Sequence, residues 1–156
     1  MDAEQSLQQV ALFQELKPKL VKNLAKRTTM RTFQPGQVIV SEGQAGMGLY
    51  CIGAGKVKIT QNTANGSREV RTMSAGESFG ELSLLDNQPR AATVTAVEPT
   101  TAYLLDKAQF LGELQTYPEI ALTILPVLVR WLRDADHRIA ELSSGEDAAA
   151  EAEARA

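Results

Sequence analysis

The sequence predicts an α+β protein in which an antiparallel β jelly roll lies between short N-terminal helices and a long C-terminal helix. Two observations lead to this prediction. Between residues 28 and 105, short segments of alternating apolar residues are separated by glycine every few positions, which is typical of a small β sandwich or barrel. On both sides of that stretch the apolar residues recur at helical spacing. With 156 residues and 44% hydrophobic content, the chain is long enough for one domain with a sizeable core.

The N-terminal segment, residues 1–27, is expected to be helical. Its apolar residues between positions 7 and 25 follow helical spacing, and the pattern fits two short helices divided near residues 13–18. Proline is tolerated in the first turn of a helix because its missing N–H has no intrahelical partner there. Pro18 is therefore compatible with the beginning of the second helix.

Residues 28–105 are expected to form the jelly roll, in which seven strands can be placed from the sequence. Asn65-Gly66 is a hairpin signal between the segments KVKIT and REVRT. In the first of these segments Val57 and Ile59 alternate with polar residues, so one face of the strand should pack in the core while the other is solvated. The predicted strands are 30–33, 38–41, 49–52, 57–61, 69–73, 92–97 and 101–105.

Residues 106–142 are predicted to form two helices. Asp106 can cap the first helix, and Tyr117-Pro118 ends it and opens the second, longer helix. Pro126 lies inside the second helix, where proline removes one backbone hydrogen bond and crowds the preceding turn. A kink or a break is therefore expected at this position.

The long helix has two apolar stripes, which suggests two packing partners. One stripe repeats in steps of four and three residues, which is the pattern of a coiled-coil seam. We expect one stripe to pack on the domain and the other on a twin helix, which predicts a homodimer formed through residues 120–142. A helix that packs only on its own sandwich is the alternative interpretation. The seam consists of Ala121, Leu125, Leu128, Leu132, Ala135, Ile139 and Leu142, and the second stripe of Ile120, Ile124, Val127 and Trp131.

The net charge of −3 is concentrated at the C-terminus. Residues 141–156 hold five acids and one base, which leaves 15 bases and 14 acids in residues 1–140. A nearly neutral body argues against nucleic acid as a partner, because proteins that bind phosphate backbones usually carry a strong basic excess. The basic residues between positions 17 and 31 are expected to form a solvated helix face or, in a second interpretation, a docking surface for an acidic partner. Residues 143–156 are expected to form a flexible acidic tail.

Two classes of protein are disfavoured by composition. No apolar run approaches the roughly 18 residues of a membrane span, and the N-terminus has no secretion signal, so a cytoplasmic protein without a membrane partner is expected.

The single cysteine, Cys51, lies in an apolar run and should be a small buried hydrophobe. The single histidine, His137, lies in a charged helical stretch and should be solvated. A metal-dependent, cupin-like enzyme would need clustered ligands, so no metal, cofactor or catalytic residue is expected.

The stretch FGELSLLDNQPRAATV, residues 79–94, predicts a receptor for a small anion. A one-turn helix at residues 81–85 would present unpaired backbone N–H groups, and Gly80 would let the chain approach a ligand closely. Arg90 provides a permanently charged, planar group that can pair with a phosphate through two hydrogen bonds. Glu81 fits beside an anion if it accepts a hydrogen bond from a hydroxyl on the same ligand. A sugar phosphate meets all of these demands.

This stretch resembles the phosphate-binding cassette of cyclic nucleotide-binding domains. The family includes bacterial catabolite activator proteins and the regulatory subunits of cAMP-dependent protein kinases. The resemblance extends over roughly residues 5–142 and implies an eight-stranded jelly roll with the cassette inserted before the last strands. The cassette residues that match the family are Phe79, Gly80, Glu81, Leu82, Leu84, Leu85, Pro89, Arg90, Ala92 and Val94.

The resemblance implies a role for each cassette residue. Arg90 would pair with the cyclic phosphate, and Glu81 would accept a hydrogen bond from the ribose 2′-hydroxyl. The backbone amides of Ser83 and Ala91 would bind phosphate oxygens, and serine at position 83 is a small departure from the alanine or glycine more common in the family. The residues expected at the phosphate are Leu82, Ser83, Arg90 and Ala91, and those expected at the ribose are Gly80 and Glu81.

The resemblance also bears on the choice of nucleotide. Family members that prefer cGMP often have threonine directly after the cassette arginine, whereas this chain has Ala91, which favours cAMP. Asp136 falls near the position that caps the base, although an exposed helix residue paired with a neighbouring arginine is the alternative. Trp131 could stack on the base as a lid, or it could serve as a core or dimer contact. The residues expected to contact the base are Ile59, Val70, Ala92, Trp131 and Asp136.

The sequence therefore predicts a non-catalytic cyclic nucleotide sensor, with cAMP as the expected ligand and cGMP as the second. Residues 106–142 would serve as lid and dimer helices and would signal to a dimer or to a downstream protein. A truncated transcriptional regulator of the catabolite activator type is the alternative. Such regulators continue into a helix-turn-helix of roughly 20 residues or more, whereas 14 residues, rich in acidic side chains, follow Leu142 in this sequence.

Overall fold

The structure is a computed structural model, and it describes residues 1–143. The helices are α1 (Ala3–Gln8), η1 (Ala11–Phe13), α2 (Pro18–Lys26), η2 (Glu81–Leu84), α3 (Lys107–Thr116) and α4 (Glu119–Leu142), of which η1 and η2 are single 3₁₀ turns. The strands are β1 (Thr29–Phe33), β2 (Val38–Val40), β3 (Gly48–Ala54), β4 (Lys56–Thr63), β5 (Gly66–Ser74), β6 (Ser78–Phe79), β7 (Thr93–Ala96) and β8 (Thr100–Asp106).

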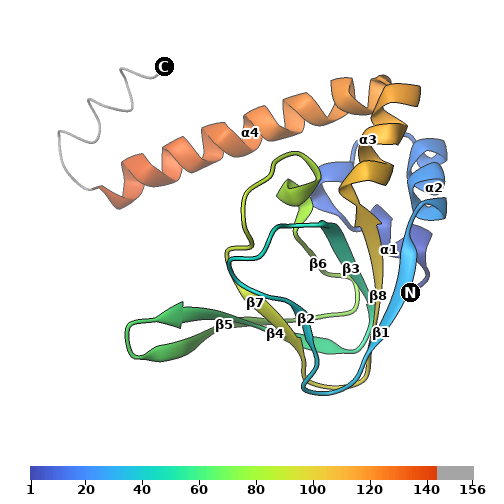
Figure 1. The fold of residues 1–156 in the computed structure, drawn as a ribbon. Helices are drawn as coiled ribbons and strands as arrows, with labels where there is room; N and C mark the ends of the chain where they lie inside the picture. Colours follow the sequence, from blue (N-terminus) through green and yellow to red (C-terminus); the bar gives the residue numbers. More distant parts are fainter. Residues whose placement is uncertain (144–156) are drawn as a thin grey trace.

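The eight strands of the described region form two four-stranded antiparallel sheets, with strand orders β1-β8-β3-β6 and β2-β7-β4-β5. The helices α1, α2 and α3 gather at one end of this sandwich, while α4 extends past it and beyond the cassette turn (Figure 1). The predicted α+β jelly-roll class is confirmed. The predicted acidic tail falls almost entirely on residues 144–156, which lie outside the described region.

All seven predicted strands form, with their ends shifted by a few residues. The sequence did not indicate β6, because a two-residue strand is too short to show an alternating pattern. The predicted hairpin is present, since Thr63 pairs with Gly66 across a two-residue turn that ends at Asn65. This hairpin, β4–β5, projects from the body of the sandwich (Figure 1).

Strand β3 separates two hydrophobic clusters, because its side chains alternate between its two faces. Leu49 and Cys51 pack with the helices, whereas Tyr50 and Ile52 pack inside the sandwich. Burial, together with the nearby charge of Glu81, raises the pKa of the Cys51 thiol to about 12. Cys51 is therefore the protonated, buried hydrophobe that the sequence predicted.

The N-terminal and C-terminal helices form one cluster on the outer side of β3. This cluster also contains Leu84 of η2, so the cassette turn is packed against the helices as well as the sheet. Asp106 caps α3 as predicted, with its side chain accepting a hydrogen bond from the Gln109 N–H at 2.8 Å. The segment Tyr117-Pro118 separates α3 from α4, also as predicted.

Helix α4 uses its two apolar stripes differently. The stripe that begins at Ile120 faces the domain: Ile120, Ile124 and Val127 are buried, and Trp131 packs against the same cluster. A second row is exposed along the described length of the helix, and it consists of Leu122, Leu125, Val129, Leu132, Ile139 and Leu142.

This exposed row corrects the predicted seam. Leu128 belongs with the inward stripe because it packs on the helical cluster, and Leu122 and Val129 take the exposed positions instead. Of the kink or break expected at Pro126, the break does not occur, since α4 continues through this residue. Pro126 is exposed, and the Leu122 side chain is 70% exposed, so the carbonyl that loses its partner lies on the solvated side of the helix. His137 is exposed, as predicted.

Candidate functional site

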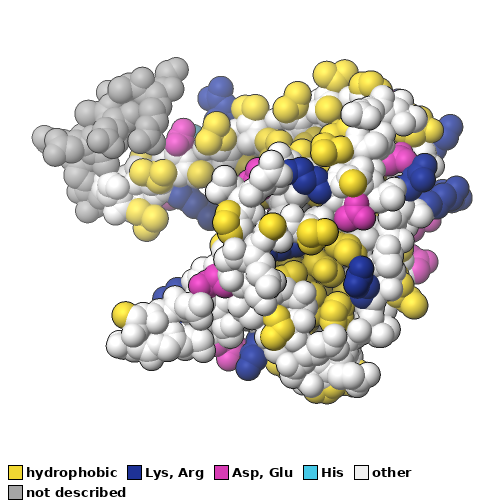
Figure 2. All heavy atoms as spheres, viewed as in Figure 1, with side chains coloured by type: hydrophobic (Ala, Val, Ile, Leu, Met, Phe, Trp, Pro, Cys, Tyr) yellow, Lys and Arg dark blue, Asp and Glu magenta, His cyan; other side chains and the backbone are white. Residues whose placement is uncertain are grey.

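A cavity of about 520 Å³ opens between the second sheet and the cassette. Figure 2 shows the hollow below α4, with hydrophobic side chains on its floor. Strands β2, β4, β5, β6 and β7 form one side of the cavity, and residues 80–92 form the other. The lining residues are Val40, Ile59, Arg71, Met73, Ser78, Phe79, Gly80, Glu81, Leu82, Ser83, Asp86, Gln88, Pro89, Arg90, Ala91, Ala92 and Val94.

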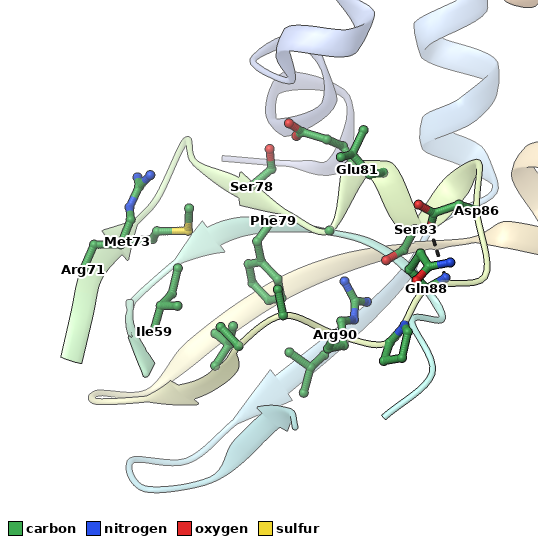
Figure 3. A pocket seen from close by; sticks show the side chains of 17 residues that line it. Ile59, Arg71, Met73, Ser78, Phe79, Glu81, Ser83, Asp86, Gln88 and Arg90 are labelled. Carbon is green, nitrogen blue, oxygen red and sulfur yellow. Dashed lines mark hydrogen bonds between the residues drawn. The ribbon is translucent and has the colours of Figure 1, made fainter. Parts of the chain in front are cut away.

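The cavity has an apolar end and a polar end. Ile59, Met73 and Phe79 gather at one end, while Ser83 and Arg90 lie at the other with neighbouring polar side chains (Figure 3). The Phe79 ring is held by stacking on Tyr50, with ring centroids 5.2 Å apart. Such a division suits a ligand that has a flat apolar part and a charged part.

Gly80 shapes the polar end. It adopts the left-handed conformation, with φ at 84°, immediately before η2. A Cβ atom at this position would overlap the Arg90 guanidinium and would lie 2.7 Å from the Gly48 carbonyl oxygen. Glycine is therefore needed here both for its backbone conformation and for the close approach of Arg90.

Arg90 is the central charged group of the site. Its side chain is 8% exposed, and its Nη2 donates a hydrogen bond to the Gly48 carbonyl at 2.7 Å. Its guanidinium lies 5.9 Å from the centre of the Tyr50 ring, and its buried Nε has no hydrogen-bond partner. Among residues 1–143 no carboxylate forms an ion pair with it. Burial lowers the pKa of Arg90, since a charge removed from water is disfavoured, although the group stays protonated.

The backbone of Arg90 is fixed independently of its side chain. Its N–H donates to the Gln44 carbonyl at 2.7 Å, and its own carbonyl accepts from the Gly43 N–H at 2.9 Å. These bonds attach the end of the cassette to the loop between β2 and β3. The guanidinium is thus held in the cavity with one neutral carbonyl partner and a fully buried Nε donor that is unused, which is the arrangement expected of an anion-binding group.

Glu81 is the second charged group of the predicted site. It is half-buried and lines the same cavity as Arg90. Burial raises the pKa of its carboxyl group above the usual value of 4.5, because the charged form is poorly solvated. No donor within residues 1–143 is recorded as hydrogen-bonded to this carboxylate. It is therefore available to accept a hydrogen bond from a ligand hydroxyl.

Most of the predicted site residues meet in this cavity. The predicted residues that line it are Ile59, Gly80, Glu81, Leu82, Ser83, Arg90, Ala91 and Ala92. The backbone N–H of Ser83 already donates to the Gly80 carbonyl at 3.0 Å, so a phosphate oxygen would have to share or replace that bond. The Ser83 side chain is buried at the polar end of the cavity, close to Gly46.

Val70 lies elsewhere, and a β-bulge explains its position. Ile59 pairs with Arg71 and the next residue of β4 pairs with Glu69, so Val70 has no partner in the ladder. Its side chain is 46% exposed and does not line the cavity, whereas Arg71 and Met73 of the same strand do. The sequence pattern missed these two residues because the register of a half-polar strand depends on its partner.

Trp131 and Asp136 of α4 are also absent from the cavity wall. Trp131 packs on the helical cluster, and Asp136 is half-buried on the later part of α4. Contact between these residues and a ligand would require α4 to move toward the cavity.

Neither a cluster of metal ligands nor a helix suited to span a membrane occurs in the described region. Within residues 1–143 no group of three or more His, Cys, Asp and Glu side chains is placed to hold a metal ion. In the same part of the chain, no helix has the length and apolar character needed to cross a membrane.

Comparison with known proteins identifies relatives over most of the chain. The sequence model of one family, the cyclic nucleotide-binding domain, matches residues 30–117. A CRP-like cAMP-activated global transcriptional regulator of Mycobacterium tuberculosis is 31% identical over 89% of this chain, which spans 62% of that protein. A cGMP-dependent protein kinase of Eimeria tenella is 39% identical over 71% of this chain and 11% of the kinase.

A solved structure is also similar in fold. The crystal structure of the N-terminal domain of a transcriptional regulator from Streptomyces coelicolor superposes with a TM-score of 0.79 at 30% identity. The match covers 83% of this chain and 94% of that domain.

The geometry at Gly80 predicts a large cost for a single methyl group. Gly80→Ala should lower the free energy of unfolding by about 3 kcal/mol, because it adds a steric overlap with Arg90 to the roughly 1 to 2 kcal/mol penalty of the left-handed conformation. Gly43 is a matched control, since it has the same φ of 84° with no atom within 4 Å of a Cβ. Gly43→Ala should therefore show the conformational penalty alone. Urea denaturation followed by circular dichroism measures both, and equal losses would contradict the proposed contact.

Proposed function

The chain belongs to the cyclic nucleotide-binding domain family, and from this premise we propose that it is a non-catalytic sensor of a 3′,5′-cyclic nucleotide. The environment of Arg90 supports the proposal most strongly. A buried guanidinium without a carboxylate partner, and with one buried donor unused, favours binding of an anion. The cavity around it also provides a carboxylate and an apolar wall, which match the ribose and the base of the same ligand.

In this proposal the cyclic phosphate binds the guanidinium of Arg90 at the polar end of the cavity. The Arg90 Nε would gain a partner, and the bond from Nη2 to Gly48 could be exchanged for one to a phosphate oxygen. The backbone N–H groups of Leu82, Ser83 and Ala91 would supply further donors. A charged hydrogen bond in a partly buried site is stronger than one in water, so Arg90 should dominate the affinity.

The ribose and the base would occupy the rest of the cavity. Glu81 would accept a hydrogen bond from the 2′-hydroxyl next to Gly80, while Ile59 and Ala92 would contact the base. Phe79 and Met73 extend the same apolar wall.

We favour cAMP as the ligand because Ala91 has no hydroxyl to offer to a guanine amino group. The position of Arg71 favours cGMP as the second candidate. It lines the cavity and forms an exposed ion pair with Glu77 at 2.9 Å, from which it could turn to guanine. Arginine pairs well with the O6 and N7 acceptors of guanine. The kinase relative of Eimeria tenella supports testing both nucleotides.

Signal output is proposed to pass through α4. A ligand that binds one position of α4 better than another would shift the population toward that position. Trp131 and Asp136 would reach the base only in a position closer to the cavity. The exposed row from Leu122 to Leu142 would meet the same row of a second copy, which gives a homodimer through residues 120–142.

We propose no individual downstream partner, only a second copy of this chain or another protein that contacts α4. Because the chain spans 62% of the Mycobacterium tuberculosis regulator, one part of a catabolite-activator-type transcriptional regulator is the second candidate function. In both cases this domain reports nucleotide binding and performs no catalysis. DNA contacts are not proposed for residues 1–140, since their charge is nearly balanced.

Removal of the Arg90 side chain should abolish most of the affinity. We expect Arg90→Ala to weaken binding by roughly 100-fold or more, because the phosphate loses a partly buried ionic partner. Arg31→Ala is the control, since Arg31 is exposed on β1 away from the cavity. Calorimetric titration of refolded, ligand-free protein with cAMP, cGMP and 5′-AMP measures the effect. Equal affinity of wild type and Arg90→Ala would exclude this site, and binding of none of the nucleotides by folded wild type would exclude the function.

Affinity should also depend on pH through Glu81. Its pKa in the free protein is raised, and a bond from a ribose hydroxyl to the carboxylate would lower that pKa in the complex. Affinity should therefore be greatest where Glu81 is already charged and should fall with falling pH, starting above the ordinary value of 4.5. Glu81→Gln should bind more weakly at neutral pH and lose this dependence. A wild-type curve that is flat down to pH 4.5 would argue against the carboxylate as the acceptor.

The exposed row on α4 should determine the oligomeric state. Leu132→Glu places a charge in the middle of that row and should convert a dimer into a monomer, because two like charges would face each other in the interface. His137→Glu adds a charge at an exposed position outside the row and should leave the dimer intact. Light scattering coupled to size-exclusion chromatography gives the mass of each. A wild-type protein that is monomeric at tens of micromolar would refute the dimer.

A further inference from the structure

Lys107 occupies a position that helix formation alone does not favour. It is the first residue of α3, directly after the N-cap Asp106, and the first turn of this helix contains no acidic residue. A cation at a helix N-terminus opposes the helix dipole, so lysine is normally unfavourable there. The position suggests that the ammonium group serves a purpose outside α3.

The contacts of Lys107 indicate that purpose. Its Nζ donates a hydrogen bond to the Asp86 carbonyl at 2.7 Å and a second one to the Asn87 side-chain oxygen. Both acceptors belong to the turn that follows η2 in the cassette, and Asp86 also lines the cavity. The backbone N–H of Lys107 donates to the Met47 carbonyl at 2.9 Å. One residue therefore joins the cassette turn, α3 and the beginning of β3.

The other attachments of this part of the cassette are an apolar anchor at Leu84 and hydrogen bonds within the turn itself. Leu84 anchors η2 in the helical cluster beside Phe110 of α3, and both side chains are fully buried. The N–H groups of Leu85 and Asp86 both donate to the Leu82 carbonyl, at 3.0 and 3.1 Å, so they bond only within the turn. Among residues 1–143, the hydrogen bonds from Lys107 are thus the ones that connect the end of this turn to α3.

The same end of α3 lies next to the partner of Arg90. Gly48, whose carbonyl accepts from the Arg90 guanidinium, pairs with Asp106 at the end of β8. A displacement of the start of α3 would therefore affect the cassette both at Asp86 and Asn87 and at Arg90. We infer that Lys107 is a positioning residue, which holds the cassette turn at α3 in the geometry that ligand binding requires and links that turn to the helices that precede α4.

The consequence for affinity rests on the proposed function, whereas the contact itself can be tested without a ligand. The experiment measures hydrogen–deuterium exchange of the ligand-free full chain, and then titrates the same proteins with cAMP and cGMP. The variants are Lys107→Met, which keeps an apolar stem and removes the ammonium, and Lys107→Arg, which restores a donor. Lys22→Met is the matched control, because Lys22 is exposed on α2 and has no recorded contact with the cassette.

We expect Lys107→Met to increase exchange at Leu85 and Asp86 roughly tenfold, because charged hydrogen bonds no longer oppose opening of the turn. Affinity should fall roughly three- to tenfold, and Lys107→Arg should recover most of both effects. Exchange within α3 should stay the same or slow, since a cation unfavourable to the helix dipole has been removed. A purely structural role in α3 predicts the opposite, with faster exchange in the helix.

Any other result of these experiments would either support or overturn the inference. Unchanged exchange in the cassette of Lys107→Met would overturn the inference, as would faster exchange with unchanged affinity, since the turn would then not matter for binding. Equal effects in Lys22→Met would show a general charge effect and would also overturn it. Faster cassette exchange in a protein whose wild type binds neither nucleotide would support the Lys107 contact and remove the proposed function.

Discussion

The organisation of this protein depends on a buried arginine that has no carboxylate partner. Taking a guanidinium out of water is unfavourable, and one carbonyl bond with an aromatic face offsets that cost only partly. The surrounding chain nevertheless leaves room for Arg90, since side chains at Gly46 and Gly80 would collide with it or its neighbours. The anion site that we propose would explain this arrangement, because the ligand would supply the missing charge.

Strand β3 connects that site to the helices. Its inward side chain Tyr50 lies under the guanidinium, while its outward neighbours Leu49 and Cys51 pack against the helical cluster. The cassette reaches the same cluster through Leu84. The residues around Arg90 are thus joined to α3 and α4 by contiguous packed side chains of β3 and η2.

Helix α4 divides its apolar residues between the domain and the solvent. Burial of Ile120, Ile124 and Val127 attaches its first half to the core, whereas its second half extends beyond the sandwich (Figure 1). The exposed apolar row runs along both halves. Exposed rows of this size on a soluble helix usually mark a binding surface. In the proposed function, the buried face of α4 would link it to the domain that binds the ligand, and the exposed row would be the surface that a second copy contacts.

The sequence by itself determined the fold class, the positions of seven of the eight described strands and the cassette, because turn residues, residue periodicity and a contiguous motif are local properties of the chain. Only the tertiary structure decided the register of β5, where a bulge turns Val70 outward and brings Arg71 and Met73 to the cavity. It also decided which face of α4 is buried and that Lys107 contacts the cassette turn. These features depend on residues far apart in the sequence, whose contacts are set by how sheets and helices pack together rather than by any local pattern.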